Sequence, residues 1–325
     1  MASKAPLTLS KAKRQKVKAA IQLQGLSGLG KSGLALAMAY ALNGDWTKVG
    51  CVDTENNSLL LYPGTKLHTG ETIPDDTLMH IGLNDETGYA PTTYAEARDI
   101  LIENGADVVI MDSISHMWTR KDGVLDQAAV KKEKNPSLDN YRVWGQEDIV
   151  KEKNEIFELV RSNKAHMIST VRVKEKFAMT YDETKGKNTV ESKGEQQVQQ
   201  DGLKYEYDLV LNMEQAGSVT GNLVTNPKVT VIKSRYPMFI VGETVEVTPK
   251  LLKELHDYLE EGASVESIEE SRRQEYIDAI KTMCDTDATK KTLWQNIKNA
   301  AGYKETKLVD LPLNALKLLY AQFVE

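Results

Sequence analysis

Short apolar runs alternate with helix-like stretches along most of the chain. Runs such as "KVGCVDTE" (48–55) and "ADVVIMDS" (106–113) are compact and apolar, which is typical of buried strands. Between them, "KSGLALAMAYALN" (31–43) is rich in Ala and Leu, and "GQEDIVKEKNEIFELVRSN" (145–163) shows helical apolar spacing. Further strands are predicted at 19–24, 165–173, 205–214 and 228–237, and a further helix at 92–105. This alternation predicts an α/β fold with a mainly parallel twisted sheet flanked by helices.

Two charged stretches lack this pattern. Residues 116–142 contain "KKEKNPSLDN", and residues 174–204 are charged and contain glycine, so both are predicted as loops or mobile insertions. The stretch "EGASVESIEES" is typical of a linker, and residues 265–325 show helical spacing. We therefore expect a basic arm at 1–18, a core at 19–261 and a small helical module at 265–325. The expected core of that module is Trp294, Leu316, Leu319 and Phe323.

Composition describes an ordinary globular protein of 325 residues, with 41% hydrophobic and 27% charged residues. The net charge of −6 gives no global basic field, although local basic loops suffice for nucleic-acid binding. Residues 1–18 are the exception, because they carry six basic residues and no acidic one. This arm is either solvated chain or a contact to a phosphate backbone or another subunit.

The cysteine pattern supports neither a disulfide framework nor a zinc site. Cys51 lies in a predicted buried strand and Cys284 in a predicted helix, and the histidines have no ligand spacing. No apolar run is long enough to span a membrane, and the basic start lacks the apolar stretch of a signal peptide. We expect a reducing, cytoplasmic setting and no membrane partner.

The segment "GLSGLGKSG" lies between a predicted strand and a predicted helix. It fits G-x-x-x-x-G-K-[ST] at Gly25, Gly30, Lys31 and Ser32. Glycines allow backbone N–H groups to converge on phosphate oxygens, and the following helix N-terminus adds partial positive charge. Lys31 would reach the outer phosphates of ATP, and the Ser32 hydroxyl would ligate Mg²⁺. The predicted phosphate loop comprises Gly25, Leu26, Ser27, Gly28, Leu29, Gly30, Lys31, Ser32 and Gly33.

Two carboxylates follow predicted strands. Asp112 closes "VVIMD" and is the predicted Mg²⁺-holding aspartate of a nucleotide site. Glu55 ends the strand after the phosphate-loop helix, where it could orient a water molecule for attack on the terminal phosphate. The alternative for Glu55 is a surface acid in a turn.

The segments "VGCVDTENN", "ADVVIMDSIS" and "VTVIKSRYP" together resemble the RecA-type ATPase core. By that resemblance, Lys233 and Arg235 would reach the γ-phosphate of ATP bound by the neighbouring subunit and assist catalysis there. Cations at developing charge accelerate phosphoryl transfer. The alternative is a basic strand end on the surface.

Residues 19–250 are most similar to phage-encoded RecA-core ATPases of single-strand annealing and recombination, through "DGLKYEYDLVLNME" and the K-x-R segment. One departure is Thr170, which stands where many RecA-type proteins have a γ-phosphate-sensing glutamine. The chain also shows no counterpart of the RecA polymerisation strand, so a ring or short oligomer is as open as a filament.

The resemblance also implies that two loops bind single-stranded DNA. The candidates, chosen as cations for phosphates and a ring for base stacking, are Arg120, Lys121, Arg172, Lys174, Lys176 and Phe177. The alternative is charged loops that are simply solvated.

The function expected from these features is an ATP-dependent, single-stranded-DNA-binding recombination or annealing ATPase that works as a homo-oligomer. A single-strand-binding protein or other recombination proteins are further candidate partners. A hexameric helicase-type motor or loader, and a non-catalytic ATP-gated scaffold, stay open as alternatives.

Overall fold

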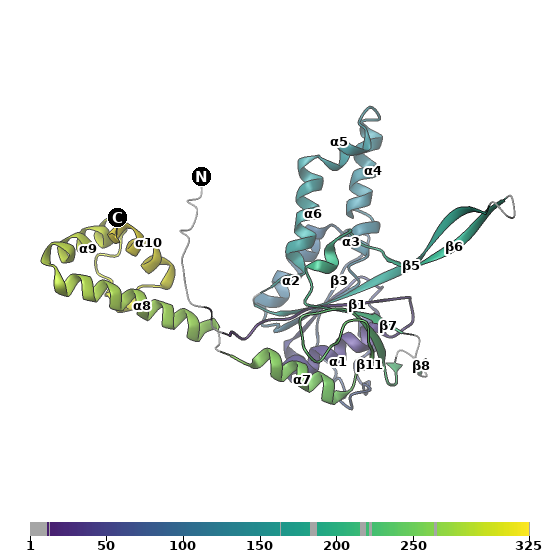
Figure 1. Ribbon diagram of the computed structural model, residues 1–325, viewed down its shortest axis with the longest axis horizontal. Helices are drawn as coiled ribbons and strands as arrows, with labels where there is room; N and C mark the ends of the chain where they lie inside the picture. Colours follow the sequence, from purple (N-terminus) through teal and green to yellow (C-terminus); the bar gives the residue numbers. More distant parts are fainter. Residues whose placement is uncertain are drawn as a thin grey trace. The chain divides into compact units, whose positions relative to one another are not determined.

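The computed structural model describes residues 12, 14–162, 164–182, 187–214, 219–220, 223–262 and 265–324 (Figure 1). The chain forms two compact units. One unit is Val17–Leu259, and the other combines residues 1–16 with residues 260–325. Each unit is described by itself below.

The larger unit is built on a nine-stranded sheet in the order β11-β10-β7-β1-β5-β4-β2-β3, with β6 paired to β5. The strands β7, β1, β5, β4, β2 and β3 run parallel to one another, whereas β10 is antiparallel to β7 and β11 is antiparallel to β10. Their bounds are β1 (Ala20–Gly25), β2 (Val49–Asp53), β3 (Met79–Gly82), β4 (Val108–Asp112), β5 (His166–Asp182), β7 (Leu209–Met213), β10 (Lys228–Ser234) and β11 (Thr244–Glu246). The predicted α/β class with a mainly parallel sheet is confirmed.

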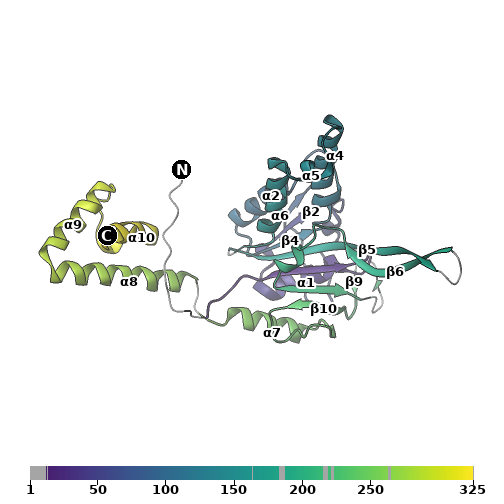
Figure 2. The ribbon, with the colours of Figure 1, turned by 45° about the horizontal axis from the view of Figure 1, so that its top comes forward.

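Helices cover both faces of this sheet (Figure 2). On one face lie α1 (Lys31–Asn43) and α7 (Pro249–Glu260), and on the other lie α2 (Pro91–Glu103) and α6 (Glu147–Leu159). Alternate strand residues face opposite sides, so Val108 and Ile110 join the core under α1 while Val109 and Met111 join the core under α2 and α6. Three short 3₁₀ helices, Trp46–Lys48, Ser58–Leu61 and Leu203–Tyr205, lie in the connections.

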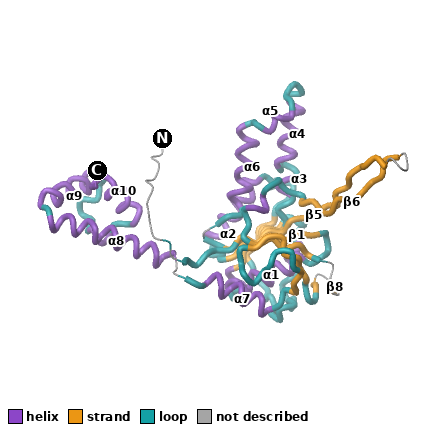
Figure 3. Tube along the Cα trace, viewed as in Figure 1, coloured by secondary structure: helices purple, strands orange, loops and turns teal. Residues whose placement is uncertain are grey.

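The prediction of a loop at 116–142 is wrong. This segment forms α3 (His116–Thr119), α4 (Val124–Lys134) and α5 (Asn140–Trp144), of which α4 and α5 project with α6 (Figure 3). A few apolar positions are enough to hold these helices in place. Val124 and Val143 are buried in the core, and the rings of Trp118 and Trp144 stack with their centroids 6.0 Å apart. The charged residues between them are exposed helix surface.

The prediction of a loop at 174–204 is also wrong for most of its length. Strand β5 continues to Asp182 and pairs antiparallel with β6 (Lys187–Gln197). The resulting hairpin extends beyond the sheet (Figure 1). A second small hairpin joins β8 (Val219–Thr220) to β9 (Leu223–Val224).

The smaller unit contains α8 (Val265–Thr286), α9 (Ala288–Ala300), the 3₁₀ helix Leu308–Asp310 and α10 (Leu313–Val324). Its own apolar core includes the four predicted residues Trp294, Leu316, Leu319 and Phe323. The predicted C-terminal helices are therefore confirmed. Nowhere in the described ranges does a helix combine the length and apolarity needed to cross a bilayer.

Candidate nucleotide-binding site

The carboxyl ends of β1, β2 and β4 meet at one edge of the sheet, level with Arg172 of the longer parallel strand β5. The register pairs Asp53 with Asp112 and Gly25 with Arg172. At this edge lies a cavity of about 300 Å³. Its lining is Ser27, Gly28, Gly30, Lys31, Ser32, Glu55, Ser58, Leu61, Tyr62, Asp112 and Arg172.

The predicted phosphate loop joins β1 to α1. Gly25, Gly28 and Gly30 have φ values of +151°, +82° and +81°, which favour glycine. A Cβ on Gly25 would lie 3.0 Å from the Cβ of Met213, so β7 would have to move by a few tenths of an ångström to admit a larger residue there. Gly30 is the N-cap of α1, so the unsatisfied amides of the first helical turn begin at Lys31 and Ser32. Loop and helix together form a candidate anion site.

Lys31 is buried, and its ammonium is held by the loop itself. Its Nζ donates hydrogen bonds to the carbonyl oxygens of Gly25 at 3.1 Å and Leu26 at 2.8 Å. Burial lowers the pKa of Lys31, an effect that Asp112 and Glu55 partly oppose. Leu26 is exposed, Leu29 packs against the core, and Gly33 is buried in the first turn of α1.

Ser32 and Asp112 are in direct contact. The Ser32 hydroxyl donates to Asp112 Oδ2 at 2.5 Å, and the Thr170 hydroxyl donates to Asp112 Oδ1. Asp112 is almost fully buried, and this burial raises its pKa, although both hydrogen bonds oppose the shift. A hydroxyl and a carboxylate are oxygen ligands of the kind that Mg²⁺ prefers, so the donor set fits that ion.

Glu55 lies at the cavity wall and forms an ion pair with Arg172. Arg172 Nε donates to Glu55 Oε1 at 2.8 Å, and Arg172 Nη2 donates to Glu55 Oε2. Sequence reasoning placed Arg172 among the DNA-binding candidates, whereas the structure places it on the wall of the phosphate-loop cavity.

Sequence reasoning missed Asp53, which shapes the turn that carries Glu55. Its fully buried carboxylate accepts hydrogen bonds from the backbone N–H groups of Glu55 at 2.7 Å and Leu59 at 2.8 Å. Burial alone would raise the pKa of Asp53, but the His80 ring, whose Nε2 lies 3.5 Å from Asp53 Oδ2, and the hydrogen bonds from these amides outweigh it and hold the pKa low. An aspartate two residues before a candidate glutamate was the available signal.

His116 was missed as well. Its Nδ1 lies 2.7 Å from the Thr54 hydroxyl, and its Nε2 lies 4.0 Å from Glu55 Oε1. The ring is 2% exposed, and Nε2 has no hydrogen-bond partner within the described part of the chain. Burial lowers the pKa of His116, which favours the neutral ring.

Tyr62, also missed, closes the cavity from the segment after β2. Burial, with a smaller contribution from Asp112, raises the pKa of Tyr62 to about 12, so its phenol stays protonated.

Lys233 and Arg235 lie beside the amino ends of the parallel strands, at the opposite side of the sheet from the phosphate loop. Strand β10 is antiparallel to β7, and Ser234 pairs with Leu209 at the beginning of β7. Lys233 Nζ donates to the carbonyl oxygens of Tyr205 at 2.7 Å and Tyr207 at 2.6 Å. Arg235 Nη1 pairs with Asp208 Oδ1 at 3.0 Å. The structure therefore does not bring these cations to the phosphate loop of their own chain.

The other DNA-binding candidates lie on two separate segments. Arg120 and Lys121 are exposed after α3, and Lys121 Nζ donates to the carbonyl oxygen of Asp85 at 2.7 Å. Lys174 is exposed where β5 leaves the sheet. Lys176 and Phe177 belong to the same strand, but their side chains lie outside the described residues.

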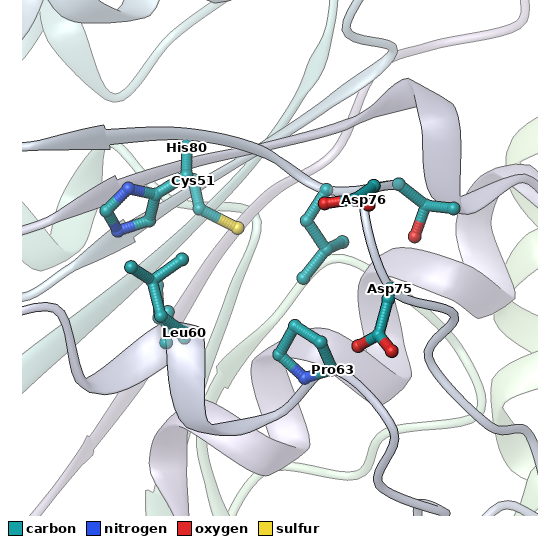
Figure 4. A pocket seen from close by; sticks show the side chains of 9 residues that line it. Cys51, Leu60, Pro63, Asp75, Asp76 and His80 are labelled. Atoms are coloured by element: carbon teal, nitrogen blue, oxygen red, sulfur yellow. The ribbon is translucent and has the colours of Figure 1, made fainter.

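A second cavity, of about 440 Å³, lies beside β2 and β3 (Figure 4). Cys51 and His80 line it from the sheet, and Asp75 and Asp76 line it from the connection before β3. Burial raises the pKa of the Cys51 thiol, which is therefore neutral. None of the residues predicted from the sequence to bind ATP, Mg²⁺ or DNA lines this cavity.

Of the comparisons with known proteins, only the one with solved structures found similar chains. No protein-family model matches the chain, and no curated protein matches it. Among solved structures, a crystal structure of the RadB recombinase is 16% identical, covers 72% of this chain and 90% of its own, and has a TM-score of 0.41.

Proposed function

We propose that the chain is an ATPase of the RecA type. The observation that carries the proposal is the convergence of Lys31, Ser32, Glu55 and Asp112 on one cavity at the carboxyl edge of a parallel sheet. A glycine-rich strand-to-helix turn, two oxygen ligands and a further carboxylate are the components that hydrolysis of a nucleoside triphosphate requires.

Each component has a distinct role in the proposed reaction. The amides of the loop and of the first turn of α1 bind the phosphate oxygens, and Lys31 exchanges its carbonyl partners for the outer phosphates. Ser32 and Asp112 hold Mg²⁺, which when bound neutralises charge on the phosphates. Glu55 orients the attacking water molecule and accepts its proton.

Lys233 and Arg235 complete the site of a neighbouring copy in this proposal. Because they lie at the edge opposite to their own phosphate loop, they can assist catalysis only in trans. ATP would then lie between subunits, and its hydrolysis would change the contact between them. A ring, a short oligomer and a filament all provide such an interface.

Single-stranded DNA is the proposed polymer ligand. Arg120 and Lys121 are exposed cations on the segment that follows β4, and Lys174 is an exposed cation of β5, two residues after Arg172 on the cavity wall. Binding through phosphate contacts predicts an affinity that falls steeply with salt concentration. The hairpin β5–β6 is continuous with Arg172, so nucleotide at the loop and DNA at the hairpin would affect each other.

The test is an ATPase assay with and without single-stranded DNA. DNA should raise the rate of the wild type, and Lys31→Ala should abolish nucleotide binding. Glu55→Gln should bind ATP but lose activity by about 10²–10⁴-fold. ATP hydrolysis that persists in Lys31→Ala would contradict the proposed site.

A non-catalytic, ATP-gated scaffold is the second candidate. The observation that favours it is the pairing of Glu55 with Arg172, which occupies both carboxylate oxygens. Tight ATP binding with slow hydrolysis that DNA does not change would support this alternative. Strand unwinding on forked duplexes would instead support a helicase-type motor.

A further inference from the structure

The ion pair between Glu55 and Arg172 is a distinct feature of the cavity. Both carboxylate oxygens of Glu55 face the guanidinium, through Nε at 2.8 Å and through Nη2. A glutamate that orients water needs at least one oxygen directed at that water. In this pairing Glu55 is held by a cation instead.

Arg172 occupies a position from which it can reach a bound triphosphate. It pairs in register with Gly25, the first residue of the phosphate loop, and lines the same cavity as Lys31 and Ser32. It also lies two residues after Thr170 on β5, so the two side chains share one face of the strand. Thr170 uses its hydroxyl on Asp112, which leaves Arg172 as the cation that β5 presents to the cavity.

The backbone of Arg172 is fixed while its side chain is exchangeable. Its N–H donates to Ser115 Oγ at 2.9 Å, and its carbonyl oxygen accepts from Val198 N–H at 2.8 Å. The side chains of Arg172 and Glu55 are 39% and 24% exposed. Because both side chains are partly open to solvent, their attraction is screened, so a ligand of higher negative charge can displace Glu55 from Arg172.

A terminal phosphate is such a partner. Guanidinium binds phosphate through two parallel hydrogen bonds and is well suited to this exchange. Without nucleotide, the cations Lys31 and Arg172 share the cavity with the acids Glu55 and Asp112. A triphosphate adds negative charge beside Lys31 and Arg172, which favours transfer of Arg172 from the carboxylate to the phosphate.

Glu55 has a second partner close by once Arg172 leaves. His116 Nε2 lies 4.0 Å from Glu55 Oε1 and is buried without a hydrogen-bond partner among the described residues. In the tautomer with its proton on Nε2, the ring can donate to one oxygen of the released carboxylate. The other oxygen then remains for water.

We propose that Arg172 senses the terminal phosphate and holds Glu55 inactive until a triphosphate binds. This inference rests on the proposed ATPase function and names the residue that regulates it. Arg172 is a positioning residue for Glu55 in the absence of nucleotide, and a phosphate ligand in its presence. Glu55 would then be free to orient the attacking water molecule only when a terminal phosphate is present to hold Arg172.

The test compares affinity for ADP with affinity for an ATP analogue that has a non-hydrolysable β–γ link, both with Mg²⁺ and the full chain. Arg172→Gln should weaken analogue binding about tenfold or more and change ADP binding little. Arg172→Lys should fall between, because it keeps the charge and loses the two-pronged geometry. Glu55→Gln should tighten analogue binding up to about fivefold, because it removes the competing carboxylate.

Arg142→Gln is the matched control, because Arg142 is an exposed, ion-paired arginine that does not line the cavity. It should leave both affinities unchanged, and unchanged melting temperatures would establish that each variant is folded. Equal losses for ADP and the analogue in Arg172→Gln, or weaker analogue binding in Glu55→Gln, would overturn the sensor proposal. A wild type that binds neither nucleotide would overturn the proposed ATPase as well. If the wild type hydrolyses ATP but Arg172→Gln has the same ratio of analogue affinity to ADP affinity as the wild type, only the sensor proposal is overturned.

Discussion

Burial shifts the pKa values of the acidic and basic residues of the cavity in opposite directions. It lowers the pKa of Lys31 and raises the pKa of Asp112, so each group is less stable in its charged form than it would be in water. Ser32 and Thr170 compensate Asp112, and the carbonyl oxygens of Gly25 and Leu26 compensate Lys31. The proposed site therefore reduces the stability of the fold before any ligand binds.

The substitution Asp112→Asn tests this cost. The folded-state pKa of Asp112 lies above its unfolded value, so its contribution to stability is lost as the pH rises from below the usual carboxylate range towards neutrality. The neutral amide should therefore raise the melting temperature at pH 7, by roughly 2–4 °C for each kcal/mol recovered, and have no such effect at low pH. Metal-dependent nucleotide binding should be lost in the same variant.

Melting curves at several pH values provide the measurement. Asp75→Asn is the control, because Asp75 is an exposed aspartate in the same unit and should show no comparable gain on going to neutral pH. At each pH, the quantity to compare is the melting temperature of Asp112→Asn minus that of the wild type. A difference that is smaller at pH 7 than at low pH would contradict this account.

For single residues, local sequence patterns predict the site residues that lie at the ends of parallel strands. Asp112 and Glu55 were predicted because each ends or closely follows an apolar run, and the structure places both beside Lys31 and Ser32. Arg172 was assigned to DNA because it is a cation in a segment that the family resemblance implies binds DNA. Its pairing with Glu55 spans 117 positions in sequence, so no local pattern predicts it. Only the register of β5 beside β1 reveals that contact.

Among the elements, the turn between β1 and α1 has the strictest backbone requirement. Gly25 combines a φ of +151° with a potential Cβ contact of 3.0 Å to Met213. Gly25→Ala should therefore destabilise the fold by about 1–3 kcal/mol and weaken nucleotide binding. Urea denaturation of the wild type and the variant measures the first effect.

Gly105→Ala separates the two causes. Gly105 has a φ of +97°, but a Cβ there would meet no atom within 4 Å. It should therefore incur the backbone cost without the collision, and should not change nucleotide binding. Equal losses of stability in the two variants would mean that the approach of Met213 has no effect.

Segments rich in charged residues were predicted as loops although they form helices and strands. Helix α4 has only Val124 and Ala128 as buried residues, and most of its other positions are charged or polar, so its sequence was interpreted as a loop. The extension of β5 and its pairing with β6 are similarly set by partner strand and register rather than by apolar alternation. Strands β1, β2, β4 and β7 were predictable because nearly all of their residues are buried.

In the whole molecule, the described residues form two units with separate apolar cores. The larger unit contains the whole candidate nucleotide site. The assignment of residues 1–18, 19–261 and 265–325 to an arm, an ATPase core and a helical module stays a prediction. Within the larger unit, the phosphate loop and Arg235 lie at opposite edges of one sheet, an arrangement suited to head-to-tail assembly.

Hydrolysis at subunit interfaces is the central claim, and mixing two inactive variants tests it most directly. Lys31→Ala has an intact Arg235 and no functional loop, whereas Arg235→Ala has an intact loop and no trans-acting arginine. In a random equimolar mixture, about one interface in four combines the two intact halves. The ATPase rate of the mixture should therefore clearly exceed the sum of the separate rates. A mixture that only matches that sum, or full activity of Arg235→Ala alone, would contradict a site completed by the neighbouring subunit.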